Sequence, residues 1–232
     1  MRGCILEGVT AVGKSTIFRR IQQRLFEEHS AQTKLLFSEH YTERMLEHHR
    51  EANEMSELRV VEHLRELLDP LQILRRQKAQ SKFAGRSGNA SVLAVLERFL
   101  LGHVANMRMQ EKRSWAGTGQ EAGFVADLYR TADDCGLARI VLRCSDEGLA
   151  LRILSTREHR NAAWSTHLRT LGDDDRIVDY YRAWQNHLLE FADRHSAQVK
   201  PIYVNIPANA GPERLEAIGD DIYLNYIREP EA

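Results

Sequence analysis

The chain has 232 residues, of which 43% are hydrophobic, and its formal net charge at pH 7 is −1. A chain of this size can bury one sizeable core and carry a small helical insertion. Its near-neutral charge argues against general binding to nucleic acid or to an anionic membrane. The three cysteines are an odd number without paired spacing, which argues against a disulfide framework or a zinc site. Because neither a signal peptide nor an apolar run long enough to cross a bilayer is found, a cytoplasmic location is expected.

The first expected elements follow the order strand, loop, helix. Residues 4–6 form a short apolar run, a glycine-rich turn follows them, and residues 16–28 carry apolar side chains at helical spacing. A second strand is expected at residues 34–37. This order is the one that a phosphate-binding loop between a strand and a helix requires.

A helical region is expected next, between the second and the third strand. An apolar stripe with spacings of three and four predicts a helix there, formed by Met55, Leu58, Val61, Leu64, Leu67 and Leu68. Pro70 is expected to end or kink this helix, because proline lacks the backbone N–H and clashes with the preceding turn. A second helix is expected from Leu71 to about Phe83, before a loop at residues 84–89.

The rest of the sequence continues the alternation of strands and helices. Residues 91–96 are nearly all apolar, which suits a strand buried on both faces. Further strands are expected at residues 138–142 and 199–204, and helices at residues 99–112, 124–135, 148–154, 177–195 and 213–228. Such alternation predicts an α/β fold in which helices cover both faces of a parallel sheet.

One motif in the glycine-rich turn carries specific chemistry. Residues Gly8 to Ser15 fit G-x-x-x-x-G-K-[ST] at every fixed position. The glycines permit a tight loop with inward N–H groups, Lys14 can neutralise β- and γ-phosphates, and Ser15 can offer its hydroxyl oxygen to Mg²⁺. The residues expected to contact a nucleotide are Gly8, Val9, Thr10, Ala11, Val12, Gly13, Lys14, Ser15 and Thr16.

Charged residues stand at the ends of the first three expected strands. These residues are Glu7, Glu39, Glu97 and Arg98, and they converge if the three strands lie side by side. Glu39 is the candidate for orienting an acceptor hydroxyl and receiving its proton, Glu97 for holding Mg²⁺, and Arg98 for contacting the acceptor or the transferring phosphate. Glu43 or Arg44 could carry the role given to Glu39, and each charge could instead be a solvated strand end or part of a structural ion pair.

Two further segments are candidates for the site. Arg152, Arg157 and Arg160 follow the fourth strand and could form a mobile lid that stabilises charge on a transferred phosphoryl group; a solvated basic helix is the alternative. The long helix expected at 177–195 carries three aromatic residues, Tyr180, Tyr181 and Trp184. Most of them are expected to pack in the core, and the alternative is that they line an acceptor pocket. Residues 205–209 could border a nucleotide base or form a plain loop.

With these motifs the chain resembles the nucleoside and nucleotide kinase group of P-loop proteins. Glu7-Gly8 together with Lys14-Ser15-Thr16 is similar to thymidylate kinases, and Glu39 together with Glu97-Arg98 is similar to deoxynucleoside kinases. The chain departs from thymidylate kinases at Thr10, where they have an acidic residue, and at 97–99, where they have Asp-Arg-Tyr. It departs from deoxynucleoside kinases at His40, where they have proline.

The resemblance implies a single P-loop kinase domain over residues 1–232, built as a three-layer sandwich around a five-stranded parallel sheet. It also implies a helical substrate-binding region at about 41–88, an arginine lid at about 150–168, and ATP with Mg²⁺ as the phosphoryl donor. The expected acceptor is a small molecule, a nucleoside or nucleotide. Two alternatives stay open: a kinase for another hydroxylated metabolite, such as a nucleoside-like antibiotic, and a nucleotide-binding ATPase or switch module without an acceptor. A homodimer is one option for the assembly.

Overall fold

The computed structural model describes residues 1–28, 33–38, 57–80, 92–109, 121–157 and 162–228. Within these ranges the chain forms a five-stranded sheet with the order β2-β3-β1-β4-β5, and every pairing is parallel. The strands are β1 (Arg2–Glu7), β2 (Thr33–Phe37), β3 (Val92–Glu97), β4 (Leu137–Cys144) and β5 (Ile202–Ile206). The α/β class and the parallel sheet expected from the alternating pattern are confirmed.

The centre of the sheet is formed by the most apolar strands. β3 is buried along its whole length, and β1 is buried after Arg2. The strand predicted at residues 91–96 therefore occupies the doubly covered position that its composition indicates. The register pairs Leu6 of β1 with Glu97 of β3, which brings the carboxyl ends of the two strands to the same edge.

The fifth strand begins later than its apolar pattern suggests. Strand was expected from residue 199, but Ser196–Val199 is a short helix, α9, and β5 begins at Ile202. Lys200 ends the helical turn in a left-handed conformation with φ of 47°, and its N–H donates to the carbonyl of Ser196 over 2.8 Å. The prediction was wrong at this boundary because the hydrogen bonds of that turn hold the residues that precede the strand.

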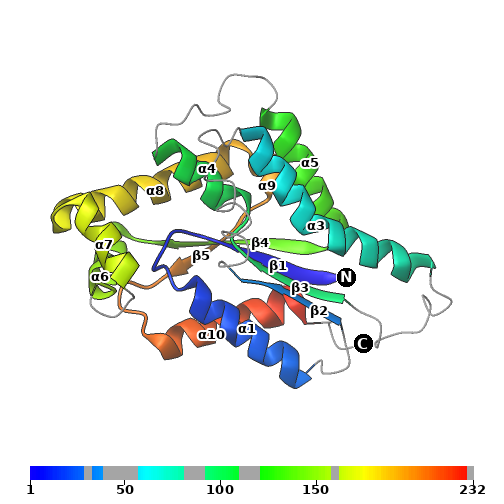
Figure 1. Ribbon diagram of the computed structural model, residues 1–232. Coiled ribbons are helices and arrows are strands. Elements are labelled where there is room, and N and C mark those ends of the chain that lie inside the picture. Colours follow the sequence, from blue (N-terminus) through cyan, green and yellow to red (C-terminus); the bar gives the residue numbers. More distant parts are fainter. Residues whose placement is uncertain (29–32, 39–56, 81–91, 110–120, 158–161, 229–232) are drawn as a thin grey trace.

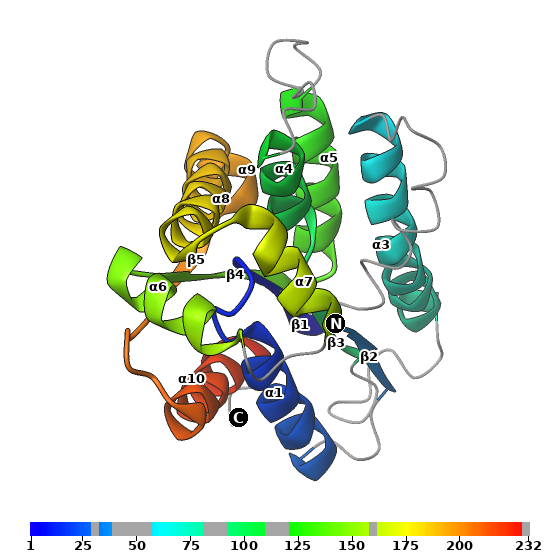
Figure 2. The same ribbon diagram turned by 60° about the vertical axis from the view of Figure 1, so that its left-hand side comes forward.

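Helices cover both faces of the sheet (Figures 1 and 2). On one face α1 (Lys14–Glu28) packs against α10 (Pro212–Ile222), and α1 buries the side chains that share its helical stripe, including Ile17, Ile21 and Leu25. The opposite face carries α3 (Glu57–Gln80), α4 (Leu100–Met109), α5 (Glu121–Asp134), α8 (Asp174–Arg194) and the short α9. The arrangement is compatible with the expected three-layer sandwich.

Two more helices lie beyond the carboxyl ends of the strands. α6 (Asp146–Ser155) follows β4, and α7 (Ala162–Leu171) lies beside it at the same end of the molecule (Figure 1). α6 begins at a side-chain cap, in which the Ser145 hydroxyl accepts the N–H of Gly148 over 3.2 Å. The arginine-bearing segment therefore flanks the edge of the sheet at which the predicted site lies.

α3 runs through Pro70 without ending there. The separate second helix expected from Leu71 is therefore wrong, whereas the kink expected as the alternative agrees with Figure 1, which shows one helix that changes direction along its length. A proline inside a helix removes one hydrogen bond and bends the axis, and packing of the apolar stripe can hold the remaining turns together. Leu64, Leu67, Leu68 and Leu71 are buried on both sides of the proline. No helix in the described ranges, α3 included, has a stretch long and apolar enough to cross a membrane.

The chain closes on a change of helix type. α10 ends at Ile222, and the next turn, Tyr223–Ile227, is a π-helix, so the single closing helix expected at 213–228 is divided. Tyr223 and Ile227 are buried in this turn and contribute to the same hydrophobic core cluster as β1 and α1. The end of the described chain is thereby packed against the sheet.

Replacing Gly3 by alanine is expected to destabilise the protein by about 1–3 kcal/mol, the usual cost of overpacking a core. β1 and β3 approach so closely that a Cβ at Gly3 would overlap the carbonyl oxygen of Ala94. The measurement is the free energy of unfolding in urea. Gly123→Ala in α5 is the control, because an added Cβ there meets nothing within 4 Å and should stabilise the helix by up to about 1 kcal/mol. Equal stability of Gly3→Ala and wild type would contradict the close approach.

Candidate functional site

The order of the strands reverses at β1. The chain passes from β1 to the edge strand β2, returns through β3, and then crosses to β4 and β5 on the other side of β1. In open parallel sheets, ligands bind beyond the carboxyl ends of the strands at such a switch point. Residues 8–13 leave β1 at this position and lead directly into α1. The topology thus points to the same loop as the sequence motif does.

Two glycines, Gly8 and Gly13, allow the backbone conformation of the loop after β1. Gly8, Ala11 and Gly13 have positive φ values of 146°, 66° and 104°. A Cβ at Gly8 would lie 2.8 Å from the carbonyl oxygen of Leu142 in β4, and a Cβ at Gly13 would lie 2.7 Å from Leu215 Cδ2 in α10. The two fixed glycines therefore allow both the turns and the close packing of the loop between its neighbours.

Lys14 and the start of α1 place positive charge over this loop. Lys14 is the first residue of α1, is 3% exposed, and donates from Nζ to the carbonyl of Val9 over 2.9 Å. The side chain thus folds back along the loop that precedes it. The N-terminus of a helix adds a partial positive charge and backbone N–H donors, so the two features together favour an anion at this position.

Ser15 links the loop to the neighbouring strand. Its hydroxyl donates to Glu97 Oε1 over 2.6 Å, from the first turn of α1 to the last residue of β3. Glu97 is 3% exposed and lies beside β1 through the pairing with Leu6. The sequence predicts that the ends of the first and the third strand come together, and the strand order and this hydrogen bond show that they do.

Arg98 extends from the same strand end into the opposite layer. Its backbone has a φ of 66°, and its N–H donates to the carbonyl of Leu6 over 2.9 Å. The guanidinium donates to Thr10 Oγ1 over 3.1 Å and lies over the ring of Trp184, with 5.6 Å between Cζ and the ring centroid. Thr10, one of the predicted nucleotide contacts, is therefore a partner of Arg98.

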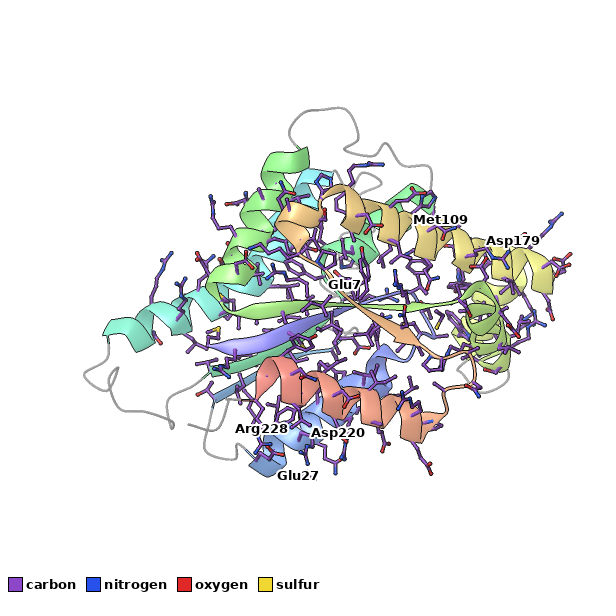
Figure 3. The ribbon with its side chains drawn as sticks, turned by 180° about the vertical axis from the view of Figure 1, so that it is seen from behind. Glu7, Glu27, Met109, Asp179, Asp220 and Arg228 are labelled. Atoms are coloured by element: carbon purple, nitrogen blue, oxygen red, sulfur yellow. The ribbon has the colours of Figure 1, made fainter. Side chains whose placement is uncertain are left out.

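Glu7 has a specific partner that the sequence does not reveal. It is 1% exposed, and its two carboxylate oxygens accept the N–H groups of Leu101 over 2.9 Å and of Gly102 over 3.2 Å at the start of α4. Figure 3 shows Glu7 between the sheet and the helical layer that contains α4. Burial raises the pKa of Glu7 to about 7, although the backbone N–H donors and the charge of Lys14 favour the carboxylate.

The arginines of the predicted lid have protein partners within the described residues. Arg152 on α6 donates to the carbonyls of Pro207 and Ala210, over 3.1 and 2.7 Å, and thereby fastens the loop after β5. Arg157 lies 2.5 Å from Asp174 at the start of α8, in a pair whose side chains are 39% and 57% exposed. An exposed ion pair of this kind contributes little to stability, so Arg157 can change partners at low cost.

Two other loop residues and two aromatic side chains of α8 pack into the core. Val9 and Val12 are buried in the hydrophobic core, and the N–H of Thr16 donates to the carbonyl of Gly13 over 3.1 Å. Tyr181 is 0% exposed and Trp184 7%, and both belong to the core, as expected for most of that set.

Several predicted site residues lie outside the described residues. They are Glu39, its alternatives Glu43 and Arg44, and Arg160, together with the ends of the helical region predicted at 41–88. β2 itself ends at Phe37 beside β3, with Phe37 paired to Leu96, so the strand that leads to Glu39 lies in the expected place.

Comparison with known proteins does not assign a family. No protein-family model matches the chain, and a search of curated proteins finds no match. The coarse fold and the site geometry therefore carry the functional argument.

Replacing Glu7 by glutamine is expected to flatten the pH dependence of stability. The pKa of Glu7 is about 7 in the folded protein, against an ordinary value of 4.5. Between these values the folded protein holds the proton and the unfolded chain does not. The free energy of unfolding of the wild type should therefore fall as the pH rises through this window, by as much as about 3 kcal/mol.

Urea unfolding at pH 5, 6 and 7 tests this expectation. Subtracting the free energy of unfolding of Glu7→Gln from that of the wild type at each pH cancels the contribution of the histidines, which both proteins share. Glu27→Gln, on the exposed side of α1, is the matched control and should reproduce the wild-type profile. If the wild-type and Glu7→Gln profiles run parallel, the pKa of Glu7 is not raised.

Proposed function

We propose that the protein is an ATP- and Mg²⁺-dependent kinase of a small molecule, and that its acceptor is a nucleoside or nucleotide. In this proposal residues Gly8 to Ser15 form a phosphate-binding loop of the P-loop type, in a single P-loop kinase domain. The observation that carries the proposal is the joint placement of three features at the switch point of the sheet. They are the glycine-dependent loop, Lys14 folded over it, and Ser15 bonded to a carboxylate on the adjacent strand.

Phosphate binding is the best-supported part of the proposal. A polyphosphate needs backbone N–H donors, a cation and a helix N-terminus, and these meet between β1 and α1. Lys14 is buried beside the loop, so its charge is little screened by solvent. In this role the Lys14 ammonium exchanges the carbonyl of Val9 for the β- and γ-phosphate oxygens.

The donor set at the loop suits Mg²⁺. Ser15 and Glu97 offer a hydroxyl and a carboxylate, which are hard oxygen ligands, in hydrogen-bond contact at 2.6 Å. The described residues contain no group of three or more His, Cys, Asp or Glu side chains that could hold a metal ion by itself. Mg²⁺ at nucleotide sites usually takes one or two protein ligands and shares phosphate oxygens. Ser15 and Glu97 would hold it, and when bound it neutralises charge on the phosphates.

The remaining roles are proposed from the contacts of Arg98 and Arg152 and from the place of the other residues in the sequence. Arg98, beside Thr10 of the loop, stabilises negative charge on the phosphoryl group or on its acceptor. Glu39 follows the strand next to β3 and is proposed to orient the acceptor hydroxyl and receive its proton. Arg157 and Arg160 are proposed to close over the site as a lid, while Arg152, bonded to the loop after β5, holds that loop in place.

Turnover of ATP with and without candidate acceptors separates this proposal from its alternatives. Stimulation by nucleosides or nucleotides supports it, whereas stimulation by another hydroxylated metabolite alone assigns a different acceptor. Turnover that responds to no acceptor would make the protein an ATPase or a switch module.

Lys14→Ala is expected to weaken binding of ATP by roughly 30-fold or more, because it removes a buried cation from the phosphates, and to abolish turnover. Calorimetry with ATP and Mg²⁺ measures the first effect and a coupled ADP assay the second. Lys34→Ala removes the same charge from β2, on the far side of β3 from the loop, and should change neither. Retained turnover in Lys14→Ala, with wild-type affinity, would contradict the central assignment.

Ser15→Ala and Glu97→Gln are expected to raise the Mg²⁺ concentration needed for half-maximal turnover, because each removes one of the two oxygen ligands. The expected shift is about tenfold for each variant, as for the loss of one charge-assisted contact. ATP affinity measured without Mg²⁺ should change much less, and this comparison is the internal control. Equal Mg²⁺ dependence in Glu97→Gln and wild type would exclude Glu97 as a ligand.

A further inference from the structure

The guanidinium of Arg98 lies against an aromatic ring from a distant helix. Its Cζ is 5.6 Å from the centroid of the Trp184 ring, and the two residues are 6% and 7% exposed. A cation over the face of tryptophan is attracted by the ring quadrupole, and the attraction reaches about 2 kcal/mol when the contact is desolvated. This contact lies within the distance of about 6 Å at which a cation is attracted by a ring, and its burial shields it from solvent.

Two hydrogen bonds fix the two ends of Arg98. At its base the backbone N–H donates to the carbonyl of Leu6 over 2.9 Å and φ is 66°, a left-handed conformation that costs a non-glycine residue about 1–2 kcal/mol. At its tip one terminal nitrogen donates to Thr10 Oγ1 over 3.1 Å. The guanidinium is thus held beside the Gly8–Ser15 loop, with its Cζ over the Trp184 ring.

Trp184 is itself held firmly. Its ring stacks on Tyr181 with centroids 5.7 Å apart and an interplanar angle of 25°, and it meets Tyr180 edge to face at 6.2 Å and 76°. α8, which carries all three rings, packs against α4, the helix that follows β3 and Arg98 (Figure 2). The ring is therefore packed on two sides by other aromatic rings of α8.

The chemistry of this contact differs from that of an ion pair. A carboxylate in the place of Trp184 would occupy guanidinium N–H donors and cancel the charge. The face of a ring can orient the guanidinium without taking up its N–H donors. This kind of support suits an arginine whose N–H groups are needed by an anionic ligand.

We propose that Trp184 is a positioning residue that directs the Arg98 guanidinium toward a phosphate bound at the Gly8–Ser15 loop. The inference rests on the proposed phosphate-binding function of that loop. It adds a residue of α8, far from the motif in sequence, to the part of the site that governs charge on the phosphoryl group.

The contact itself is testable without any ligand. In NMR spectra of arginine side chains, the Arg98 Nε–H signal is assigned by its loss in Arg98→Lys. Ring current from Trp184 should shift it upfield. Trp184→Leu should return the signal to the ordinary range, and Trp184→Phe should retain part of the shift. Leu188→Ala is the matched control, because Leu188 is buried one turn further along α8 and its loss perturbs packing alone. A signal unmoved by Trp184→Leu would overturn the contact and leave the proposed function untouched.

The functional role is tested with inorganic tripolyphosphate and Mg²⁺ as the calorimetric probe. Arg98→Ala should weaken binding up to about tenfold, and Trp184→Leu should weaken it less, with Trp184→Phe closer to wild type. The double variant should bind no more weakly than Arg98→Ala, because Trp184 acts through Arg98. Leu188→Ala should bind like wild type.

Two results would overturn the proposal by different routes. Additive losses in the double variant would show that Trp184 acts through general packing. Absence of tripolyphosphate binding in the wild type would remove the proposed phosphate-binding function, and with it the role of Trp184, even where the NMR signal confirms the contact.

Discussion

The parallel pairing of β1 with β3 is the interaction on which the candidate site depends. It sets Leu6 opposite Glu97, so that the residues after each strand leave the sheet side by side. The N–H of Arg98 continues the contact by donating to the carbonyl of Leu6, one residue beyond β3. A shift of this register by one residue would turn Glu97 to the other face of the sheet, and its bond to Ser15 would be lost. The close approach at Gly3 helps to fix that register.

The same edge of the sheet buries an unusual amount of charge. Glu7, Lys14, Glu97 and Arg98 are all 6% exposed or less. Burying an ionised group is costly unless it is paired or hydrogen-bonded. Glu7 accepts amide N–H groups of α4, and Lys14 donates to the Val9 carbonyl. Glu97 accepts the Ser15 hydroxyl, and Arg98 contacts Thr10 and Trp184. The pKa of Glu7 is raised because burial disfavours its carboxylate form more than the N–H donors and Lys14 favour it. Such a concentration of buried charge around a carboxyl group with a raised pKa is typical of functional sites.

Local patterns in the sequence predict local structure well in this chain. The apolar runs give the strands, the helical spacing of Ile17, Ile21 and Leu25 gives α1, and the motif at Gly8–Ser15 locates the loop between them. The errors occur where a contact or a hydrogen bond overrides a local preference. Packing of leucines on both sides of Pro70 keeps α3 continuous, and the hydrogen bonds of α9 delay the start of β5.

Contacts between distant segments could not be predicted from the sequence. The sequence predicts that the charges at the ends of the first three strands converge only if those strands lie side by side. The structure shows β2, β3 and β1 as neighbours in the sheet. The partner of Glu7 at the start of α4 and the ring of Trp184 over Arg98 carry no signal in the sequence, because each joins residues with ordinary local patterns. An acidic residue at a strand end and a tryptophan in an amphipathic helix are compatible with many environments.

Glu97 and Arg98, at the end of β3, contact helices on opposite faces of the sheet. Glu97, the last residue of β3, contacts Ser15 on the face covered by α1. Arg98 leaves the strand in a left-handed conformation and reaches Trp184 on the face covered by α8. The loop after β1 lies between them and touches both through Ser15 and Thr10. In the proposed function, a phosphate held in that loop would have the Ser15–Glu97 pair, which suits Mg²⁺, on one side and the Arg98 guanidinium on the other. A metal ion and a cationic side chain are the groups that neutralise charge on a phosphoryl group during its transfer.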